Sequence, residues 1–479
     1  MKNRKKKALN LQTLKELFNK SSDIQFESYT FHNQQITFIT CDAMVDKQMF
    51  QQVVVERIQK FLEKKENNYN NLHLPQLTKI TNKTDAISKV YSGFVLIYFS
   101  KTGELFASDI TDRPNRQPEE TKTEVPVKGP RDNFIEDLSV NIALVRKRLP
   151  TNSLCVETFR IGRRTKTKIA MLYFDDIAKP EILKGIRDKL NKIDVDIVFS
   201  GNILMEHIDK NSRLFPRHDY TGRPDLAIQS LVRGRILILI DGVAYGVITP
   251  VSLFQLFKTA EDNEYPSIYS TFERLLRVFG VFVGALLPAF WLALITYHQN
   301  QLPLLLLATV FQSNTGLPFP SVIEMLIMLI LFELFREAGL RLPESIGGTL
   351  SVVGGLIIGD AAIRSGVTSP AMIVVIAVST VATFTLLNQS LVAAVSIIRF
   401  IAIIVTSFFG LFGFFMVFYF TLLYVANIRV FGAPYLNITA NLSSDNIKKT
   451  LFRPLQKFYK TRPVEVATND ITRINEDEE

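Results

Sequence analysis

The sequence contains no lysine between Lys258 and Lys448, and long apolar runs fill most of that interval. Residues 278–447 hold five arginines and six acidic residues, whereas residues 1–277 hold 43 of the 55 basic and 34 of the 46 acidic groups. Charged side chains are rare in segments that cross a bilayer, because burying them there is costly. The distribution therefore predicts a soluble block, a membrane block and a short charged tail.

The soluble block carries the positive net charge of the chain, which is +9 at pH 7. A basic excess fits either nucleic acid or an anionic membrane surface. No arginine- and aromatic-rich nucleic-acid motif accompanies it, so a lipid bilayer is the expected partner and nucleic acid is not. The basic start leads into a polar amphipathic helix instead of the apolar segment of a signal peptide, so the block is expected to stay cytosolic. Cys41 and Cys155 are too few for a disulfide framework.

Apolar runs of strand length alternate with amphipathic helical patterns in the soluble block. Residues 93–100 and 104–110 predict a strand pair, and Asp46 is expected to cap a helix over residues 47–64. A polar, proline-containing linker over residues 111–132 separates this unit from a second one with the same alternation. The pattern predicts two α/β subdomains, and the alternation in the second suggests a mixed sheet with helices packed on it.

These changes in composition divide the chain into four predicted parts. They are a first cytosolic α/β subdomain with its linker (1–127), a second cytosolic α/β subdomain (128–273), an all-α multi-pass membrane domain (274–436) and a cytosolic tail (437–479). The uncharged segment 278–297 is long enough to cross a bilayer core of ~30 Å. Pro288 inside it is tolerable if neighbours satisfy the carbonyl that it frees. Further candidate spans are 321–338, 346–363, 372–387 and 391–428, and the shorter segment 302–311 is expected to be interfacial or re-entrant.

The positions of Lys and Arg orient the membrane domain, because these residues stay on the cytosolic side. Arg274 and Arg277 precede the first span, and six basic residues lie within 448–462. Both ends are therefore expected inside, and the number of spans is even. Four spans result if 346–363 is re-entrant and 391–428 crosses once. Six result if 346–363 spans and 391–428 crosses twice.

Signatures of catalysis are missing from the sequence. The five histidines are scattered without an HExxH-type pair, and no GxSxG motif is present. The glycine-rich VVGGLIIGD lacks the GK[ST] ending of a phosphate-binding loop. The sequence therefore predicts no enzyme, no metal site and no cofactor.

Four charged residues lie toward the end of the second candidate span: Glu333, Arg336, Glu337 and Arg341. Their spacing of three and four residues allows ion pairs along one helix. One interpretation is a group of salt bridges at the cytosolic headgroup level. The other is a charged vestibule at the mouth of a water-filled pathway. Glu324, at the outer end of the same span, has the same two interpretations.

The next segment carries small residues on one helical stripe: Gly348, Ser351, Gly355 and Gly359. Glycine at this spacing either lets another helix pack closely or lines a narrow pore that admits ions or water. Asp360 lies near one end of the stripe, where an acidic ring would favour cations. Arg399, the one charge within 391–428, is expected to reach toward the headgroups or to pair with a carboxylate.

Six motifs are spread along most of the chain. They are KGPRDNFIEDLSVNIALVRKRL (128–149), YTGRPDLAIQSLVRGRILILIDG (220–242), PAFWLALITYH (288–298), FPSVIEMLIMLILFELFREAGLRLP (319–343), GGLIIGDAAI (354–363) and FGAPYL (431–436). As a set they resemble the A subunit of the spore germinant receptors, the GerA type of Bacillus-like spore formers. Gly222 departs from the pattern, because that family usually has a glutamate there.

The resemblance implies a location and a function. Such proteins lie in the inner membrane of the dormant spore and assemble with a transporter-like B subunit and a lipoprotein C subunit. A homo-oligomer such as a pentamer would form a nutrient-gated cation channel that triggers germination. In this chain the small-residue stripe would line the path, with Glu333, Arg336, Glu337 and Asp360 as a charged vestibule. The alternative is a non-conducting scaffold that transmits the signal and docks partner subunits through its cytosolic domain.

Overall fold

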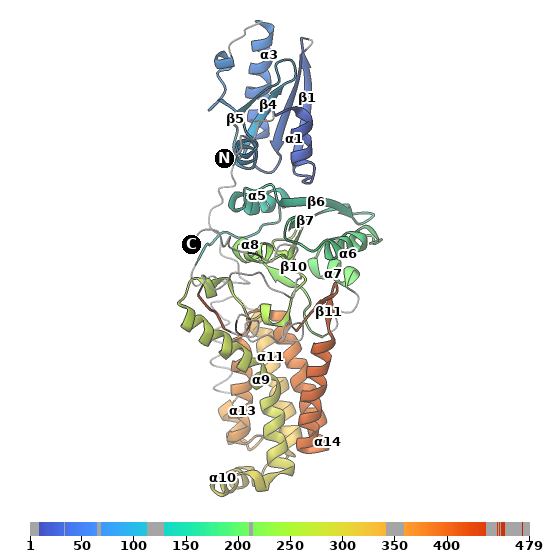
Figure 1. Ribbon diagram of the computed structural model, residues 1–479. Helices are drawn as coiled ribbons and strands as arrows, with labels where there is room; N and C mark the ends of the chain where they lie inside the picture. The colour runs from blue at the N-terminus through green and yellow to red at the C-terminus, as the bar shows by residue number, and fades with distance from the viewer. Residues whose placement is uncertain are drawn as a thin grey trace.

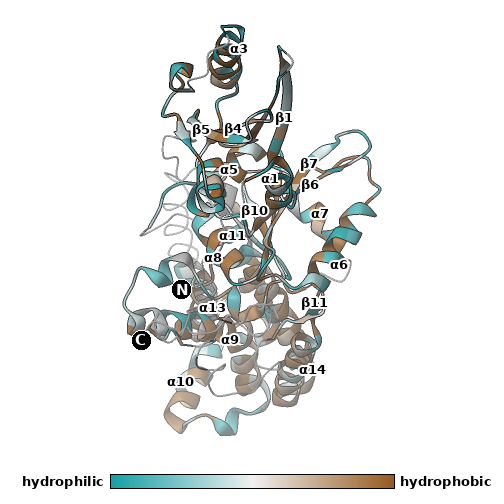
Figure 2. Cartoon of the chain, turned by 45° about the horizontal axis from the view of Figure 1, so that its top comes forward, coloured by the Kyte–Doolittle hydropathy of each residue, from teal (hydrophilic) through white to brown (hydrophobic). Residues whose placement is uncertain are grey.

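Three parts of the molecule are stacked along one long axis: two α/β subdomains and a set of long helices (Figure 1). The computed structural model describes residues 9–32, 34–64, 69–112, 129–209, 214–341 and 359–436, together with 448, 450, 452–455 and 472. Hydrophobic residues dominate the helical part, whereas hydrophilic residues are frequent in the α/β part (Figure 2). The predicted order, an α/β N-terminal region followed by helices, is confirmed.

The first α/β subdomain is built on a five-stranded sheet in the order β1-β2-β4-β5-β3. Its strands are β1 (Ile24–Phe31), β2 (Gln34–Cys41), β3 (Thr78–Lys79), β4 (Phe94–Phe99) and β5 (Glu104–Asp109). Its helices are α1 (Leu11–Phe18), α2 (Lys47–Met49), a π-helix (Phe50–Val55), α3 (Glu56–Glu63), a 3-10 helix (Tyr69–Leu72) and α4 (Lys83–Tyr91). Asp46 caps the helical run from α2 to α3 as predicted, because its Oδ1 accepts from the backbone N–H groups of Gln48 and Met49.

Strand β4 is buried along its whole length because helices cover both faces of the first sheet. Leu96 packs with residues of α1 and α4 on one face. Val95 and Ile97 pack with residues of the π-helix and α3 on the other. A continuous apolar run is what such a two-sided burial requires, so the strand was predictable from its residues.

The second α/β subdomain repeats this design with the strand order β6-β7-β9-β10-β8. Its strands are β6 (Leu154–Ile161), β7 (Thr167–Phe174), β8 (Asp219–Thr221), β9 (Ile236–Ile240) and β10 (Gly246–Thr249). Its helices are α5 (Leu138–Arg148), α6 (Pro180–Asn191), α7 (Gly201–Ile208), α8 (Pro224–Val232) and 3-10 helices at Leu253–Gln255 and Ala260–Asn263. The expectation of a mixed sheet in this subdomain is wrong, because its paired strands are all antiparallel. The paired strands of the first sheet are antiparallel too. Tight turns join β1 to β2 and β6 to β7, which antiparallel neighbours allow.

A buried ion pair fixes the two α/β subdomains to each other. Arg146 of α5 has no exposed side-chain surface, and its Nε and Nη2 lie 2.8 and 3.0 Å from the two carboxylate oxygens of Asp23. Nη2 also donates to Ser21 Oγ at 2.7 Å, and the guanidinium lies 4.3 Å from the ring centroid of Tyr91. The first arginine of the RKRL ending in the 128–149 motif therefore has a structural role.

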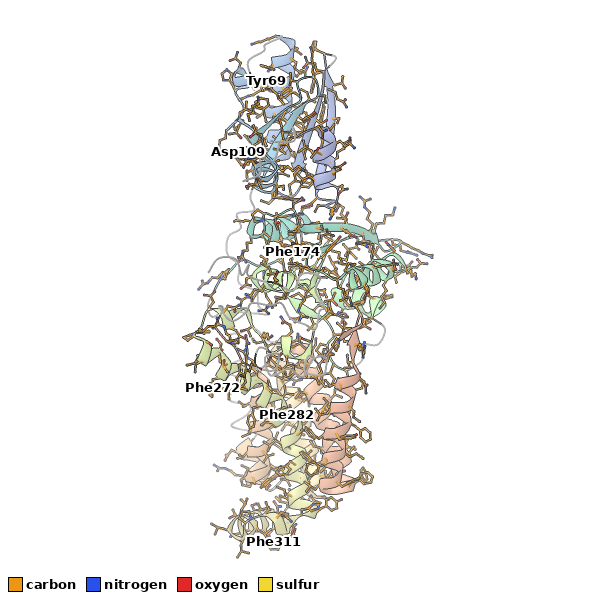
Figure 3. The ribbon with its side chains drawn as sticks, in the orientation of Figure 1. Tyr69, Asp109, Phe174, Phe272, Phe282 and Phe311 are labelled. Atoms are coloured by element: carbon orange, nitrogen blue, oxygen red, sulfur yellow. The ribbon has the colours of Figure 1, made fainter. Side chains whose placement is uncertain are left out.

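The helical part contains α9 (Ser267–Tyr297), a 3-10 helix (Gln299–Gln301), α10 (Leu304–Asn314), α11 (Ser321–Arg341), α13 (Pro370–Phe384) and α14 (Gln389–Asn427). We call these helices the helical bundle; a short hairpin of β11 (Arg429–Val430) and β12 (Ala433–Pro434) follows it. Phe272 lies at its end nearest the α/β subdomains and Phe311 at its far end (Figure 3). Within the described ranges, α9 and α14 are the helices long and apolar enough to cross a membrane, and α10 and α13 are shorter apolar helices.

Helix α14 folds back on itself at Gly410, whose φ of 58° and ψ of −140° are not helical. Contacts with α9 follow the reversal: Arg399 meets Gly284 and Ser407 meets Tyr297 before the break, whereas Phe414 meets Phe290 and Phe418 meets Phe282 after it. The two halves of α14 therefore run antiparallel. Of the two arrangements left open for residues 391–428, the geometry matches the one with two segments.

Arg341, at the end of α11, and Ser369, before α13, lie at opposite ends of the helical bundle. Glu324, in the first turn of α11, accepts hydrogen bonds from Thr368 and Ser369, so α13 starts beside the start of α11. From Glu324 to Arg341 helix α11 rises by about 26 Å at 1.5 Å per residue. Most of the candidate span 346–363 falls outside the described residues.

Candidate functional site

A partly exposed charged pair on α11 contacts α14. Glu333 and Arg336 form an ion pair within α11, and Arg336 Nη1 donates to Ser396 Oγ of α14 at 3.0 Å. Ser396 lies two turns beyond Asn388, the residue that caps α14, which is roughly 12 Å along the helix axis. The structure thus places this pair alongside the body of α14 instead of beyond its end, while Glu337 on the same helix is exposed.

The small-residue stripe falls mostly outside the described residues. Gly348, Ser351 and Gly355 are not described, whereas Gly359 and Asp360 are. A Cβ added at Gly359 would meet no described atom within 4 Å. Asp360 is exposed and pairs with Arg364 at 2.8 Å, one turn further along the chain. The described contacts do not bring Asp360 together with Glu333 and Arg336.

A second set of small residues, on α9, was missed by the sequence analysis. A Cβ added at Gly280 would lie 2.4 Å from Thr385 Oγ1 and 2.8 Å from the carbonyl oxygen of Ala382. A Cβ at Gly284 would lie 2.8 Å from Thr383 Cγ2. Glycine spaced by four residues lets helix backbones approach closely. The GxxxG spacing of Gly280 and Gly284 was the available signal for this contact between α9 and α13.

Pro288 frees the carbonyl of Gly284, because proline has no N–H to donate to the residue four positions earlier. Two side chains from other helices replace the missing donor. Arg399 Nε of α14 donates to the Gly284 oxygen at 2.7 Å, and Ser379 Oγ of α13 donates at 2.9 Å. The expectation that neighbours satisfy this carbonyl is therefore confirmed, and the residues that do so are now identified. We call Gly284, Pro288, Ser379 and Arg399 the α9 break.

Arg399 is buried in the helical bundle, with 2% of its surface exposed. The expectation that it reaches toward headgroups or pairs with a carboxylate is wrong for the described residues, since its hydrogen bond goes to the Gly284 carbonyl. Its Nη2 has no hydrogen-bond partner among them. The Gly284 carbonyl, which Pro288 leaves without its usual N–H donor, is thus the acceptor for this buried guanidinium.

Glu324 caps the start of α13. Its side chain is buried, and Oε1 accepts from Thr368 Oγ1 at 2.8 Å and from the backbone N–H and hydroxyl of Ser369 at 2.6 and 3.0 Å. A carboxylate at a helix N-terminus is favourable, because unpaired N–H groups and the helix dipole face it. This contact ties the start of α11 to the start of α13.

One short segment of the second α/β subdomain contacts the cap of α14 and the chain that follows the hairpin after it. Asn388 Oδ1 caps α14 through the N–H of Leu391 at 3.0 Å, and its Nδ2 donates to Asp219 at 2.9 Å. Beyond the β11–β12 hairpin, the Tyr435 hydroxyl donates to the carbonyl of Pro216 at 2.8 Å. Residues 216–219 therefore connect the chain before α14 with the chain after the hairpin.

Asp219 is expected to make the stability of this junction depend on pH. Burial raises its pKa to about 6, above the ~3.9 of an unfolded aspartate. Its contribution to stability is thus full below about pH 4 and is lost as pH rises through about 6. Replacing Asp219 with asparagine, which can still accept from Asn388, should remove that loss. The melting temperature of the variant, relative to that of the unmodified protein, should rise between about pH 4 and pH 7.

Thermal unfolding of the full-length protein in detergent measures this difference. His218 has a pKa that burial lowers to about 4, but it titrates in both proteins, so the difference isolates Asp219. A difference that stays constant over the whole range would contradict the assignment.

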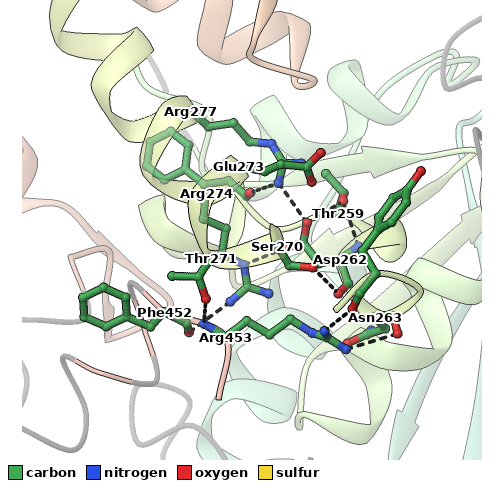
Figure 4. Close-up of polar contacts among 12 residues, drawn as sticks. Thr259, Asp262, Asn263, Ser270, Thr271, Glu273, Arg274, Arg277, Phe452 and Arg453 are labelled. Carbon is green, nitrogen blue, oxygen red and sulfur yellow. Dashed lines mark hydrogen bonds and ion pairs between the residues drawn. The ribbon is translucent and has the colours of Figure 1, made fainter. Parts of the chain in front are cut away.

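A second buried charge cluster joins the start of α9 to the subdomain before it (Figure 4). Asp262 accepts from Arg274 Nε at 2.6 Å and from Arg277 Nη1 at 3.0 Å, and 1% of its side chain is exposed. Burial favours the neutral acid, but the two arginines outweigh it and hold the pKa of Asp262 below its usual range. Arg274 and Arg277, whose charges predict the orientation of the first span, therefore also have Asp262 as a structural partner.

The tail returns to this cluster. Arg453 donates through Nη1 to the carbonyl of Tyr265 at 2.5 Å and through Nη2 to that of Asn263 at 3.1 Å. Its backbone N–H donates to Thr271 Oγ1 at 3.0 Å (Figure 4). Of the tail, Phe452 and Arg453 thus lie against the first turns of α9. No group of three or more His, Cys, Asp or Glu residues within the described part of the chain is placed to hold a metal ion.

Comparison with known proteins identifies one family that this chain matches. The model of the Bacillus/Clostridium GerA spore germination protein matches residues 12–465. Spore germination protein XA of Bacillus anthracis is 43% identical over 404 residues, which are 84% of this chain and 82% of that protein. The uncharacterized membrane protein YfkQ of Bacillus subtilis is 32% identical over 451 residues, covering 93% of this chain and 88% of that protein.

A solved structure is also similar. It is the N-terminal domain of the A subunit of the Bacillus megaterium spore germinant receptor GerK3, with 26% identity. The match covers 52% of this chain and 98% of that chain, with a TM-score of 0.40. The names of these relatives refer to germination or to a membrane, and none of them names an enzyme.

Proposed function

This chain belongs to the Bacillus/Clostridium GerA spore germination protein family, and from that premise we propose that it is the A subunit of a nutrient receptor that triggers spore germination. The receptor would lie in the spore inner membrane, with the transporter-like B subunit and the lipoprotein C subunit as partners. Nutrient binding in the complex would shift the helical bundle between two states. Such a shift would be transmitted to the second α/β subdomain through its contacts at residues 216–219 and at Asp262.

We propose further that a homo-oligomer of this subunit conducts cations. The observation that carries the proposal is the presence of Glu333, Arg336 and Arg399 alongside the bodies of apolar helices. Ionised groups at such depth face a protein interior or water, because exposure to lipid is costly. The path would be lined by the small-residue stripe that ends at Gly359, with Glu333, Arg336, Glu337 and Asp360 at its vestibule.

Six crossings are the topology that we favour. The fold-back of α14 at Gly410 supplies two antiparallel segments. Arg341 and Ser369 lie at opposite ends of the helical bundle, which supports a further crossing between them. With an even number of crossings, the N-terminal region and the tail are both cytosolic.

The alternative is a scaffold that does not conduct. The close contact of Gly280 and Gly284 with α13 favours it, because these small residues pack against another helix instead of lining a space. In this case the cytosolic region would dock the partner subunits, and the helices would only transmit the signal.

Replacing Gly359 with leucine tests conduction. An added Cβ at Gly359 meets no described atom within 4 Å, so the variant should fold and reach the membrane in normal amounts. Spores that carry it should release cations at least about tenfold more slowly on nutrient addition, because a narrow path admits ions only past small side chains. Gly359→Ala is the matched control and should release cations normally. Unchanged release from the leucine variant at normal abundance would exclude Gly359 from the path and favour the scaffold.

A further inference from the structure

The first turns of α9, residues 267–279, turn their large apolar side chains outward. Ile268 is 86% exposed and Phe272 is 57% exposed. The exposed side chains follow the spacing of one helical face and form a stripe along it: Ile268, Tyr269, Phe272, Leu275, Leu276 and Phe279. On a helix surrounded by water, a stripe of this kind faces the protein core. An exposed apolar stripe is instead typical of a surface that contacts a partner or a membrane.

The opposite face of the same turns is polar and is fixed to the protein. Arg274 and Arg277 lie 2.6 and 3.0 Å from the buried carboxylate of Asp262. Ser270 Oγ donates to the backbone carbonyl of Asp262 at 2.9 Å. Rolling the helix to bury its apolar stripe would break these contacts, and breaking a buried ion pair is costly. The stripe therefore stays on the outside of the molecule.

Helix α9 is longer than the core of a bilayer is thick. Its 31 residues extend about 45 Å at 1.5 Å per residue, whereas the uncharged residues 278–297 already suffice to cross a core of ~30 Å. Residues 267–277 thus lie beyond the core, on the side of the α/β subdomains. They lean outward from the other helices in Figure 1, and Phe272 lies to one side of the bundle in Figure 3. A helix that leans outward at this level lies along the headgroups.

We propose that residues 267–279 form an interfacial helix, with the apolar stripe inserted between the lipids of the cytosolic leaflet. Lipid is the occupant that fits, because the stripe continues into Phe282, an exposed residue of the segment expected to span. Tyr265 and Tyr269 lie at the start of the stripe with their ring centroids 5.3 Å apart, and tyrosine is enriched where a membrane meets water. An interfacial helix buries its apolar face about 5–10 Å into the boundary between headgroups and acyl chains.

This helix would hold the second α/β subdomain at the membrane surface. Asp262 joins that subdomain to the polar face of the helix, and the opposite face is in lipid. The inference rests on the proposed membrane location of the helical bundle and does not require that the bundle conducts.

Quenching of tryptophan fluorescence by brominated lipids tests the insertion in the full-length protein, reconstituted in nanodiscs. Trp291 is the single tryptophan of the chain, so Trp291→Phe gives a background into which one tryptophan is placed at a time. Phe272→Trp reports on the stripe. Phe420→Trp reports on the bundle, since Phe420 is 60% exposed near the middle of the second half of α14. Lys101→Trp is the control, in the exposed turn between β4 and β5 of the first subdomain.

Tryptophan at 272 should lose more emission to lipids brominated near the headgroup than to lipids brominated near the methyl end of the chain. Tryptophan at 420 should show the reverse order, and tryptophan at 101 should keep its emission with both lipids. Quenching at 420 without quenching at 272 would overturn the inference and leave the membrane location intact, because protein or water would then cover the stripe. Quenching at neither position would contradict the membrane location itself, and the inference with it.

Discussion

Replacing Arg146 with methionine should lower the free energy of unfolding of the two α/β subdomains by about 3–5 kcal/mol, the usual cost of removing one partner of a buried ion pair. The change leaves Asp23 with 4% of its side chain exposed and no cation beside it. Ser21 loses a hydrogen bond, and Tyr91 loses the guanidinium that lies over its ring. Because these groups come from both subdomains, the two should also stop unfolding as one unit.

Pulse proteolysis of the full-length protein in urea measures this effect, since cleavage reports the fraction of the α/β subdomains that is unfolded. Arg163→Met is the matched control. Arg163 also holds a carboxylate with two nitrogens, that of Asp194, but its side chain is 70% exposed. An exposed pair contributes about 0–1 kcal/mol, so this variant should remain close to the unmodified protein. An equal loss of unfolding free energy in the two variants would mean that burial does not strengthen the Arg146–Asp23 pair.

Gly280→Leu should separate α9 from α13 and remove most of the protein from the membrane. A Cβ at this position would lie 2.8 Å from the carbonyl oxygen of Ala382, and a helix backbone cannot move aside as a flexible side chain can. Overpacking of this kind costs about 1–3 kcal/mol and sometimes more. Losses of about 1–2 kcal/mol already change the abundance of a protein several-fold.

Abundance in the membrane fraction and the melting temperature in detergent test this expectation. Gly359→Leu makes the same substitution where an added Cβ meets no described atom, so it should leave both quantities unchanged. If Gly280→Leu matches it in both measurements, the contact between α9 and α13 is not as close as the structure places it.

Much of the α/β region could be predicted because its signals are local. Asp46 precedes an amphipathic run and caps it, and the uninterrupted apolar run of β4 gives a strand buried on both faces. The pairing of β2 with β4 and of β7 with β9 could not be predicted, because these strands lie far apart in the sequence. The partner of Arg146 was hidden for the same reason, since Asp23 lies 123 residues away in the chain.

In the helical bundle the sequence indicates that a backbone carbonyl needs a new hydrogen-bond donor, but it does not indicate which residues supply one. Pro288 requires a donor for the carbonyl that it frees, and this requirement can be stated from one residue. The donors, Arg399 and Ser379, lie 115 and 95 residues from Gly284 and are brought there only by helix packing. The depth of Glu333 and Arg336 likewise depends on where α14 lies beside α11, which no pattern within α11 specifies.

Electrical recording from the purified full-length chain in planar bilayers tests whether this subunit itself conducts ions. Cation-selective openings are expected from the unmodified protein and from Gly359→Ala, and none from Gly359→Leu inserted in equal amount. An oligomer that inserts in the bilayer but gives no conductance in any of the three proteins, with and without the partner subunits and nutrient, would contradict conduction by this subunit.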